Sequence, residues 1–236
     1  FEPGERWEYG TSLDWAGRAV ERASGLSLEA YLRRHVLGPL GMADTGFLLG
    51  PDQRARLASL HRRQPVGSLA PIAFGMPQEP EFFMGGGGLY STASDYLRFA
   101  RMLLRGGELD GARVLRPKTV AAMGTNQVGD LTVTPLRAGL PGQEVVVEFF
   151  PGTPTGWGFG GLVVTGDAPG ARRAGSWGWF GSATTHFWVD PGSGIAAVFV
   201  SQVLPFGDER ALAAAAAFER AVYAAFGERR SAPTPA

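Results

Sequence analysis

Hydrophobic residues recur every three to four positions through much of the first half of the chain, which is the spacing of an amphipathic helix. The pattern predicts three helical regions, which are residues 12–37 with a break at Ser24-Gly25, residues 91–104 and residues 117–123. Suitable caps lie at helix starts within these regions: Ser27, either Thr92 or Ser94, and Pro117. Residues 44–80 lack the spacing and contain five prolines, so long surface loops are expected there.

After residue 130 the pattern changes to short runs rich in Val, Phe, Trp and Thr, separated by Gly and Pro, which predicts β-strands. The expected strands are residues 144–150, 160–165, 179–189 and 194–202, the last two joined by a hairpin turn. A closing helix is expected over residues 208–226. Helices followed by an antiparallel meander and a helix indicate an α+β fold. We divide it into residues 1–130, mainly helical, and residues 131–236, which hold the strands and the last helix.

The composition narrows the functional classes. Of 236 residues, 44 % are hydrophobic and 19 % are charged, as in a globular protein. Lys plus Arg equals Asp plus Glu at 22 each, so net charge gives no reason to expect nucleic acid or an anionic membrane as partner. The absence of cysteine excludes disulfides and thiolate metal sites. No apolar run reaches the roughly 20 residues of a membrane span and no signal peptide is visible, which favours the cytoplasm while leaving a signal upstream of Phe1 open.

Three motifs occur in order along the chain. They read Phe-x-Pro-Gly-x-x-Trp-x-Tyr over residues 1–9, Gly-Pro-Leu-Gly-Met-x-x-Thr over 38–45 and Gly-Gly-Gly-Leu-x-Ser-Thr-x-x-Asp over 86–95. Together they resemble the β-lactamase-like serine hydrolases, closest to the esterases related to class C β-lactamases and penicillin-binding proteins. The resemblance covers residues 1–226. It implies an antiparallel sheet flanked by helices beside a helical subdomain, and acyl-enzyme chemistry without a cofactor or a metal.

Tyr9 stands at the catalytic tyrosine of this family. The resemblance implies that it helps to deprotonate the nucleophilic serine and later protonates the leaving group. A phenol, with its ordinary pKa of about 10, is a poor base at neutral pH unless a cation stabilises the phenolate. Thr11 replaces the Asn of many relatives. Without the resemblance, a tyrosine at the start of a helix is usually a half-buried packing residue.

A second candidate is the segment Trp179-Phe180-Gly181-Ser182, which matches the Trp-x-Gly form of the family's substrate strand. The resemblance implies that Gly181 lets substrate approach and that the backbone N–H of Ser182 is one of two oxyanion-hole donors. Trp179 in place of Lys or His removes the cation that binds a β-lactam carboxylate, which favours esters. Phe180 replaces a smaller residue and narrows the site. The plainer interpretation of this segment is a buried aromatic strand.

Other residues are weaker candidates. Phe74, Phe82 and Phe83 lie in an apolar loop that the resemblance puts near the acyl pocket, although such residues more often belong to a core. His186 is a candidate pocket residue or an ordinary strand residue. Ser176 sits in an approximate Gly-x-Ser-x-Gly motif, but a strand follows it where the nucleophile elbow needs a helix.

The reactive group of the family is a Ser-x-x-Lys pair. Lys118 is the only lysine, and Leu115 lies three residues before it, so no such pair exists in this chain. The resemblance therefore implies that serine and lysine come from an absent N-terminal segment or a companion chain. The sheet would then be incomplete, with an unpaired edge and an exposed apolar face.

The function expected from these residues is a serine esterase or acyl hydrolase whose partner is a small-molecule ester. An acyltransferase, an amide hydrolase or a β-lactamase of the same fold remains an alternative. A non-catalytic binding or scaffold fragment is an alternative of another class.

Overall fold

The structure, a computed structural model, describes residues 1–138, 145–148, 150, 152–167 and 171–231. Its helices are α1 (Ser12–Ser24), α2 (Leu28–Leu32), the π-helical turn η1 (Arg33–Leu37), α3 (Pro51–Ala55), α4 (Ala93–Leu104), α5 (Pro117–Met123) and α6 (Glu209–Ser231). Its strands are β1 (Leu60–Arg63), β2 (Leu69–Ile72), β3 (Glu108–Leu109), β4 (Ala112–Arg113), β5 (Leu136–Ala138), β6 (Val145–Val147), β7 (Thr155–Gly158), β8 (Gly161–Val164), β9 (Trp177–Phe180), β10 (His186–Asp190), β11 (Ile195–Phe199) and β12 (Val203–Leu204). The predicted α+β class is confirmed.

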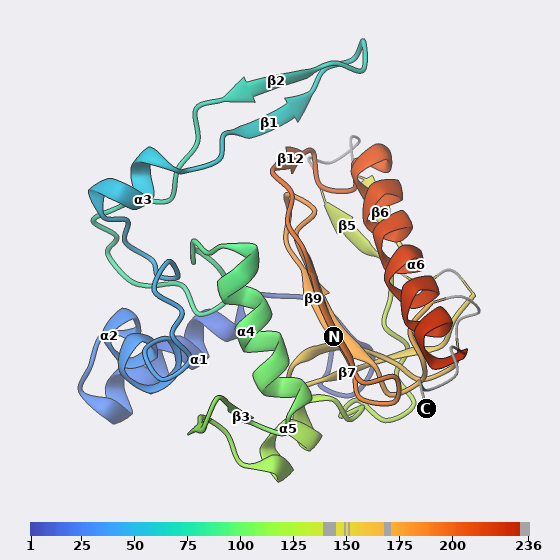
Figure 1. Cartoon of the computed structure of the whole chain (residues 1–236). Coiled ribbons are helices and arrows are strands. Elements are labelled where there is room, and N and C mark those ends of the chain that lie inside the picture. Colours follow the sequence, from blue (N-terminus) through green and yellow to red (C-terminus); the bar gives the residue numbers. More distant parts are fainter. Residues whose placement is uncertain (139–144, 149, 151, 168–170, 232–236) are drawn as a thin grey trace, which may run out of the picture.

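A five-stranded antiparallel sheet forms the centre, with strand order β11-β10-β9-β8-β7. Helix α4 packs on β10 and β11 from one side, and α6 covers the other side (Figure 1). Trp177 and Val189 of the sheet pack with Met102 and Leu103 of α4, all at most 2 % exposed. On the α6 side the buried residues Trp188, Ile195 and Ala197 contact the helix residues Phe218, Val222 and Tyr223.

A buried hydrogen-bond network joins two of the three sequence motifs. Asp95, near the start of α4, accepts from the backbone N–H of Asp44 at 2.8 Å and from the Thr45 hydroxyl at 2.9 Å. The Thr45 hydroxyl also lies 2.8 Å from the hydroxyl of Ser91. Thr45 is 2 % exposed, so these bonds form in a nearly dry environment. The network fixes the segment after η1 against the glycine-rich segment that precedes α4.

The expected loops of residues 44–80 instead contain a short helix, α3, and a hairpin, β1–β2. The hairpin projects as an arm from the layers of the body (Figure 1). Its strand β1 also pairs in parallel with β12, with His61 opposite Val203. Arg63 of the arm forms an ion pair with Asp208, which is 4 % exposed and caps α6 through the backbone N–H of Ala211. This pairing comes from residues far along the chain, which local spacing does not reveal.

The expected single strand over residues 179–189 is two strands joined by a tight turn. Within the turn the backbone N–H of Gly181 donates to the carbonyl of Thr185, and that of Thr184 donates to the carbonyl of Gly181. Thr184 adopts a positive φ of 65°, which β-branched residues rarely do, so sequence propensity gave no sign of the turn. The predicted β10–β11 hairpin is confirmed, and the caps Ser27, Thr92 and Pro117 lie where expected.

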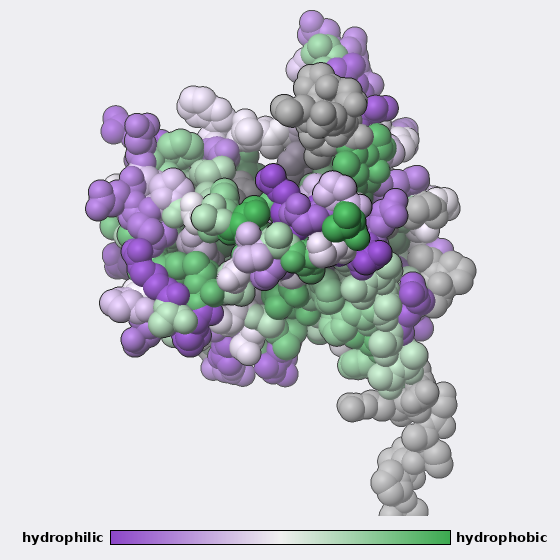
Figure 2. Space-filling model, turned by 90° about the horizontal axis from the view of Figure 1, so that it is seen from above, coloured by the Kyte–Doolittle hydropathy of each residue, from purple (hydrophilic) through white to green (hydrophobic). Residues whose placement is uncertain are grey.

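The outer surface of α6 is rich in alanine. Ala213, Ala214, Ala216 and Ala217 are exposed, and Figure 2 shows a pale green, moderately hydrophobic patch on the face that carries α6. None of the helices in the described ranges combines the length and the hydrophobicity needed to cross a membrane.

Candidate functional site

Tyr9 lies in the extended segment just before α1 and is held by three tryptophans. Trp7 is 7 % exposed and packs on Trp157, with 5.0 Å between ring centroids. The Tyr9 ring lies 6.2 Å from Trp157 and 5.3 Å from Trp179. The indole Nε1–H of Trp179 donates to the Tyr9 hydroxyl at 3.4 Å. The first motif and the Trp-x-Gly strand, 170 residues apart, therefore meet at one hydroxyl group.

Trp157, on β7, is a part of this cluster that sequence reasoning missed. Its backbone N–H donates to the Asn126 side chain at 3.1 Å, and its carbonyl accepts from Gln127 at 2.7 Å. A Cβ on Gly156 would approach Asn126 to 2.5 Å, and one on Gly158 would approach a carbonyl of the preceding segment to 2.3 Å. The Gly-x-Gly pattern around Trp157 was therefore the available signal: both glycines make room for the segment that holds the tryptophan.

Ser182 presents its backbone N–H at the exposed corner of the β9–β10 turn. The two hydrogen bonds of that turn occupy the N–H groups of Gly181 and Thr184. No acceptor within the described ranges takes the N–H of Ser182, and both Gly181 and Ser182 are exposed. A Cβ on Gly181 would meet nothing within 4 Å. The turn thus offers one unused donor beside open space, which is the geometry of half an oxyanion hole.

The glycine run 85–88 forms another wall of the site by packing against α1. A Cβ on Gly85 would lie 2.0 Å from the carbonyl oxygen of Leu13, so only glycine allows this approach. The backbone N–H of Gly86 donates to Asp14 at 2.9 Å. The run is a close-packing segment, and it fixes α1 directly after Tyr9.

These elements enclose a cleft of about 890 Å³. Its lining includes Tyr9, Gly88, Arg137, Trp179, Ser182 and Phe206. A second lobe of about 620 Å³ adjoins it, is lined by residues of α3 and of the segments on either side of the β1–β2 arm, and shares Gly88, Gly181 and Ser182 with it. The Ser182 donor therefore lies where the two lobes meet.

The predicted loop aromatics separate in the structure. Phe82 and Phe83 line an apolar pocket of about 290 Å³ together with Phe47, and this pocket shares Gly88 with the cleft. Phe74 lines the second lobe and is 64 % exposed. All three phenylalanines therefore border the cleft system rather than the main core.

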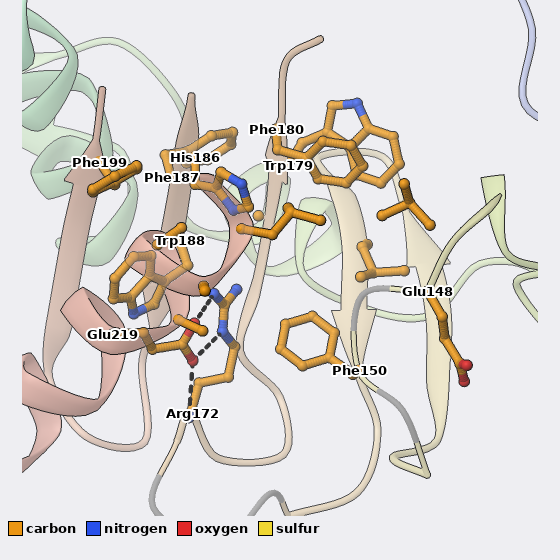
Figure 3. Close-up of a pocket in the computed structure, with 17 residues that line it drawn as sticks. Glu148, Phe150, Arg172, Trp179, Phe180, His186, Phe187, Trp188, Phe199 and Glu219 are labelled. Atoms are coloured by element: carbon orange, nitrogen blue, oxygen red, sulfur yellow. Dashed lines mark hydrogen bonds and ion pairs between the residues drawn. The ribbon is translucent and has the colours of Figure 1, made fainter. Parts of the chain in front are cut away.

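His186 lies on the opposite face of the sheet from Tyr9. It is directly across from Phe180 on β9 and from Phe199 on β11, and alternation puts all three on the α6 side. They line a cavity of about 310 Å³, shown with its ion pair between Arg172 and Glu219 in Figure 3. Burial, with the nearby Arg172 charge, lowers the pKa of His186 to about 4. Phe180 lines this cavity and the Tyr9 cleft, whereas His186 lines only the cavity.

The other candidates lie outside the cleft. Ser176 is fully buried, and its hydroxyl donates to the carbonyl of Arg173 at 2.6 Å. Lys118 is exposed at the start of α5. Within the described residues, no three His, Cys, Asp or Glu side chains come together in a way that would hold a metal ion.

Comparison with known proteins identifies the sequence family. The profile of the family described as Beta-lactamase matches residues 1–221. Lovastatin esterase from Penicillium rubens is 34 % identical over 215 residues, which cover 87 % of this chain and 53 % of that protein. Monacolin J acid methylbutanoyltransferase from Aspergillus terreus is 33 % identical over 244 residues, covering 95 % and 56 %. The family resemblance inferred from the motifs is confirmed.

Solved structures give the same result for the fold. Unliganded simvastatin synthase from Aspergillus terreus superposes with a TM-score of 0.80 at 28 % identity, covering 94 % of this chain and 56 % of that one. The chain spans about half the length of the curated relatives that it matches.

Proposed function

Because the chain belongs to the beta-lactamase family, we propose that it forms the larger part of a serine acyl hydrolase that cleaves carboxylic esters through an acyl-enzyme intermediate. The observation that carries the proposal is the meeting of the Tyr9 hydroxyl with Trp179 in a cleft that also exposes the unused N–H of Ser182. An acid–base group and an oxyanion donor then face the same bound carbonyl.

The proposed reaction has two halves. A serine hydroxyl, supplied with its lysine by a companion segment, attacks the ester carbonyl while its proton passes to the Tyr9 phenolate. The carbonyl oxygen becomes an oxyanion that accepts from the Ser182 N–H. The C–O bond to the alcohol then breaks, and Tyr9 returns the proton to the departing alkoxide. In the second half water attacks the acyl carbonyl and gives a proton to Tyr9. The bond to the serine oxygen then breaks, Tyr9 returns the proton to that oxygen, and the carboxylic acid leaves.

The cleft supports an ester as substrate. Trp179 places an indole, rather than a cation, beside the Ser182 donor. Phe180 and Phe206 stack at 5.9 Å on the same wall, so the surface nearest the reacting carbonyl is aromatic. Apolar acyl or alcohol groups gain from burial against such rings.

The test uses this chain together with the polypeptide that carries Ser-x-x-Lys. Mass spectrometry of the natural protein shows whether such a polypeptide accompanies it. A fluorophosphonate probe is expected to label that serine. Tyr9→Phe should lower kcat for a 4-nitrophenyl ester about 100- to 10,000-fold, since it removes general acid–base catalysis. Tyr31→Phe, a tyrosine on α2 outside the cleft, is the matched control. Unchanged turnover in Tyr9→Phe would defeat the proposal and favour a binding or scaffold role.

Acyl transfer to an alcohol is a second candidate, favoured by the second lobe. That lobe meets the main cleft at Gly181 and Ser182, so an acceptor alcohol bound there would reach the acyl-enzyme in place of water. The test is product analysis with an added alcohol: a new ester supports transfer, and free acid alone excludes it.

The companion segment also has a place to bind in this proposal. Strand β11 is an edge of the central sheet among the described strands, and the cavity on the α6 side has a mostly apolar lining. We propose that the segment pairs with this edge and covers that cavity. Binding of the segment should then protect the backbone amides of β11 from hydrogen exchange, and unchanged exchange would contradict this placement.

A further inference from the structure

Two charged side chains line the main cleft within the described residues, Glu8 and Arg137. Glu8 already has a partner, since its carboxylate accepts from the Arg6 guanidinium at 3.1 Å. Arg137 has no acidic side chain within 4.0 Å in the part of the chain that the structure describes. Among the described residues, the charge of the cleft wall that has no counter-ion is therefore positive.

The strand register holds Arg137 on the cleft side. Strand β5 pairs antiparallel with β6, and Arg137 stands directly opposite Val146, so the two share one face of the pair. Both line the cleft. Val147, one residue along, faces the other way, is 4 % exposed and lines the cavity on the α6 side. Turning Arg137 away from the cleft would therefore expose Val147.

Arg137 also lies on a different wall from the reacting groups. It is carried by the β5–β6 pair, whereas Trp179 and Ser182 belong to the central sheet and its β9–β10 turn. Apart from Glu8, the remaining residues that line the cleft are uncharged. A guanidinium remains charged at any physiological pH and binds a carboxylate through two parallel hydrogen bonds. It can thus select a group at the far end of a substrate without acting in the chemistry.

We propose that this site selects esters that carry a carboxylate remote from the scissile bond, and that Arg137 binds this carboxylate. The inference rests on the proposed ester hydrolysis, because binding of the carboxylate selects a substrate only if the protein cleaves esters. It differs from recognition of a β-lactam carboxylate, which lies beside the reacting amide. Arg137 acts as a specificity-determining residue, and its loss should change binding more than turnover.

The closing experiment measures binding and turnover separately. Isothermal titration calorimetry compares monomethyl suberate, an anion, with dimethyl suberate, which is neutral. The protein should bind the anion about three- to tenfold more tightly, as expected for an exposed charge-assisted pair. Arg137→Gln should bring the ratio of the two Kd values close to one, and Arg137→Lys should restore part of it. The preference should decrease as salt rises.

Turnover then uses 4-nitrophenyl hydrogen suberate and its methyl ester with the complete enzyme. The anionic ester should have the larger kcat/KM through a lower KM, and Arg137→Gln should remove this advantage by raising KM for the anionic ester. Arg105→Gln, an exposed arginine at the end of α4, is the control. Equal Kd values in the unmodified protein, or a preference for an amine-terminated analogue through Glu8, would overturn the inference. Selective binding without hydrolysis of either ester would instead refute the proposed function alone.

Discussion

The buried ion pair between Arg172 and Glu219 gives a prediction that needs no knowledge of the substrate. Arg172 donates to the two carboxylate oxygens of Glu219 at 2.9 and 2.7 Å, and the two side chains are 7 % and 13 % exposed. The guanidinium lies 4.8 Å from the ring centroids of both Phe150 and Trp188. The pair thus joins α6 to the segment before β9, with both side chains largely removed from solvent.

Glu219→Gln keeps the shape of the side chain and removes its charge. The variant leaves the Arg172 charge buried and places an amide donor against a guanidinium donor. Breaking a buried pair from one side costs about 3–5 kcal/mol of unfolding free energy. For a protein of this size that corresponds to a fall in Tm of roughly 6–20 °C. Urea unfolding followed by tryptophan fluorescence, and thermal unfolding followed by circular dichroism, measure the two quantities.

A double variant separates the charge from the packing. Arg172→Met with Glu219→Leu removes both charges and fills a similar volume, so it should recover most of the lost stability. A loss below about 1 kcal/mol in Glu219→Gln would refute the argument, because a solvated pair behaves in that way. A double variant as unstable as the single one would show that packing, rather than the unpaired charge, is responsible.

Three further predictions concern the supports of the cleft. Arg63 holds the pKa of Asp208 below its unfolded value of 3.8, so this ion pair stabilises the fold above that pH and the stabilisation is lost as the pH falls below it. The variant Asp208→Asn should therefore lose less stability on acidification than the unmodified protein, which acid unfolding curves test. Thr45→Val should cost about 1–3 kcal/mol in urea unfolding, because the buried carboxylate on α4 loses a donor; an unchanged midpoint would contradict this. Gly85→Ala should cost about 1–3 kcal/mol or more by displacing α1, whereas Gly87→Ala, whose Cβ would meet its nearest atom at 3.9 Å, is the matched control.

The parts of the fold that sequence predicted are those with local causes. Thr92 caps α4 through its own side chain, and Pro117 begins α5 because its ring suits the first helical turn. The meeting of Tyr9 with Trp179 followed from family motifs, since nothing local joins residues 170 apart. Local interactions were sufficient to predict these helices and strands, whereas the candidate site was predicted only from the resemblance to the family.

The parts that were missed have different causes. The β1–β2 arm is paired with β12 from far along the chain. The turn at Thr184 is local, but it is held by backbone hydrogen bonds from Gly181 to Thr185 and from Thr184 to Gly181 rather than by a typical turn residue. Trp157 joined the site because Gly156 and Gly158 make room for a crossing segment, and the Gly-x-Gly pattern around Trp157 was the only local sign of it. No sequence motif marked Arg137 as a candidate site residue.

The parallel pairing of the arm with β12 sets an order of events during synthesis. Arg63 and its partner Asp208, which caps α6, are 145 residues apart in the chain, and ribosomes add about 5–20 residues per second. Strand β12 and the Asp208 carboxylate, which hold the arm, are therefore synthesised roughly 7–30 s after it. Because Gln202 and Leu204 themselves line the second lobe, that lobe is completed only after residue 204 has been synthesised, long after Tyr9 and the glycine run.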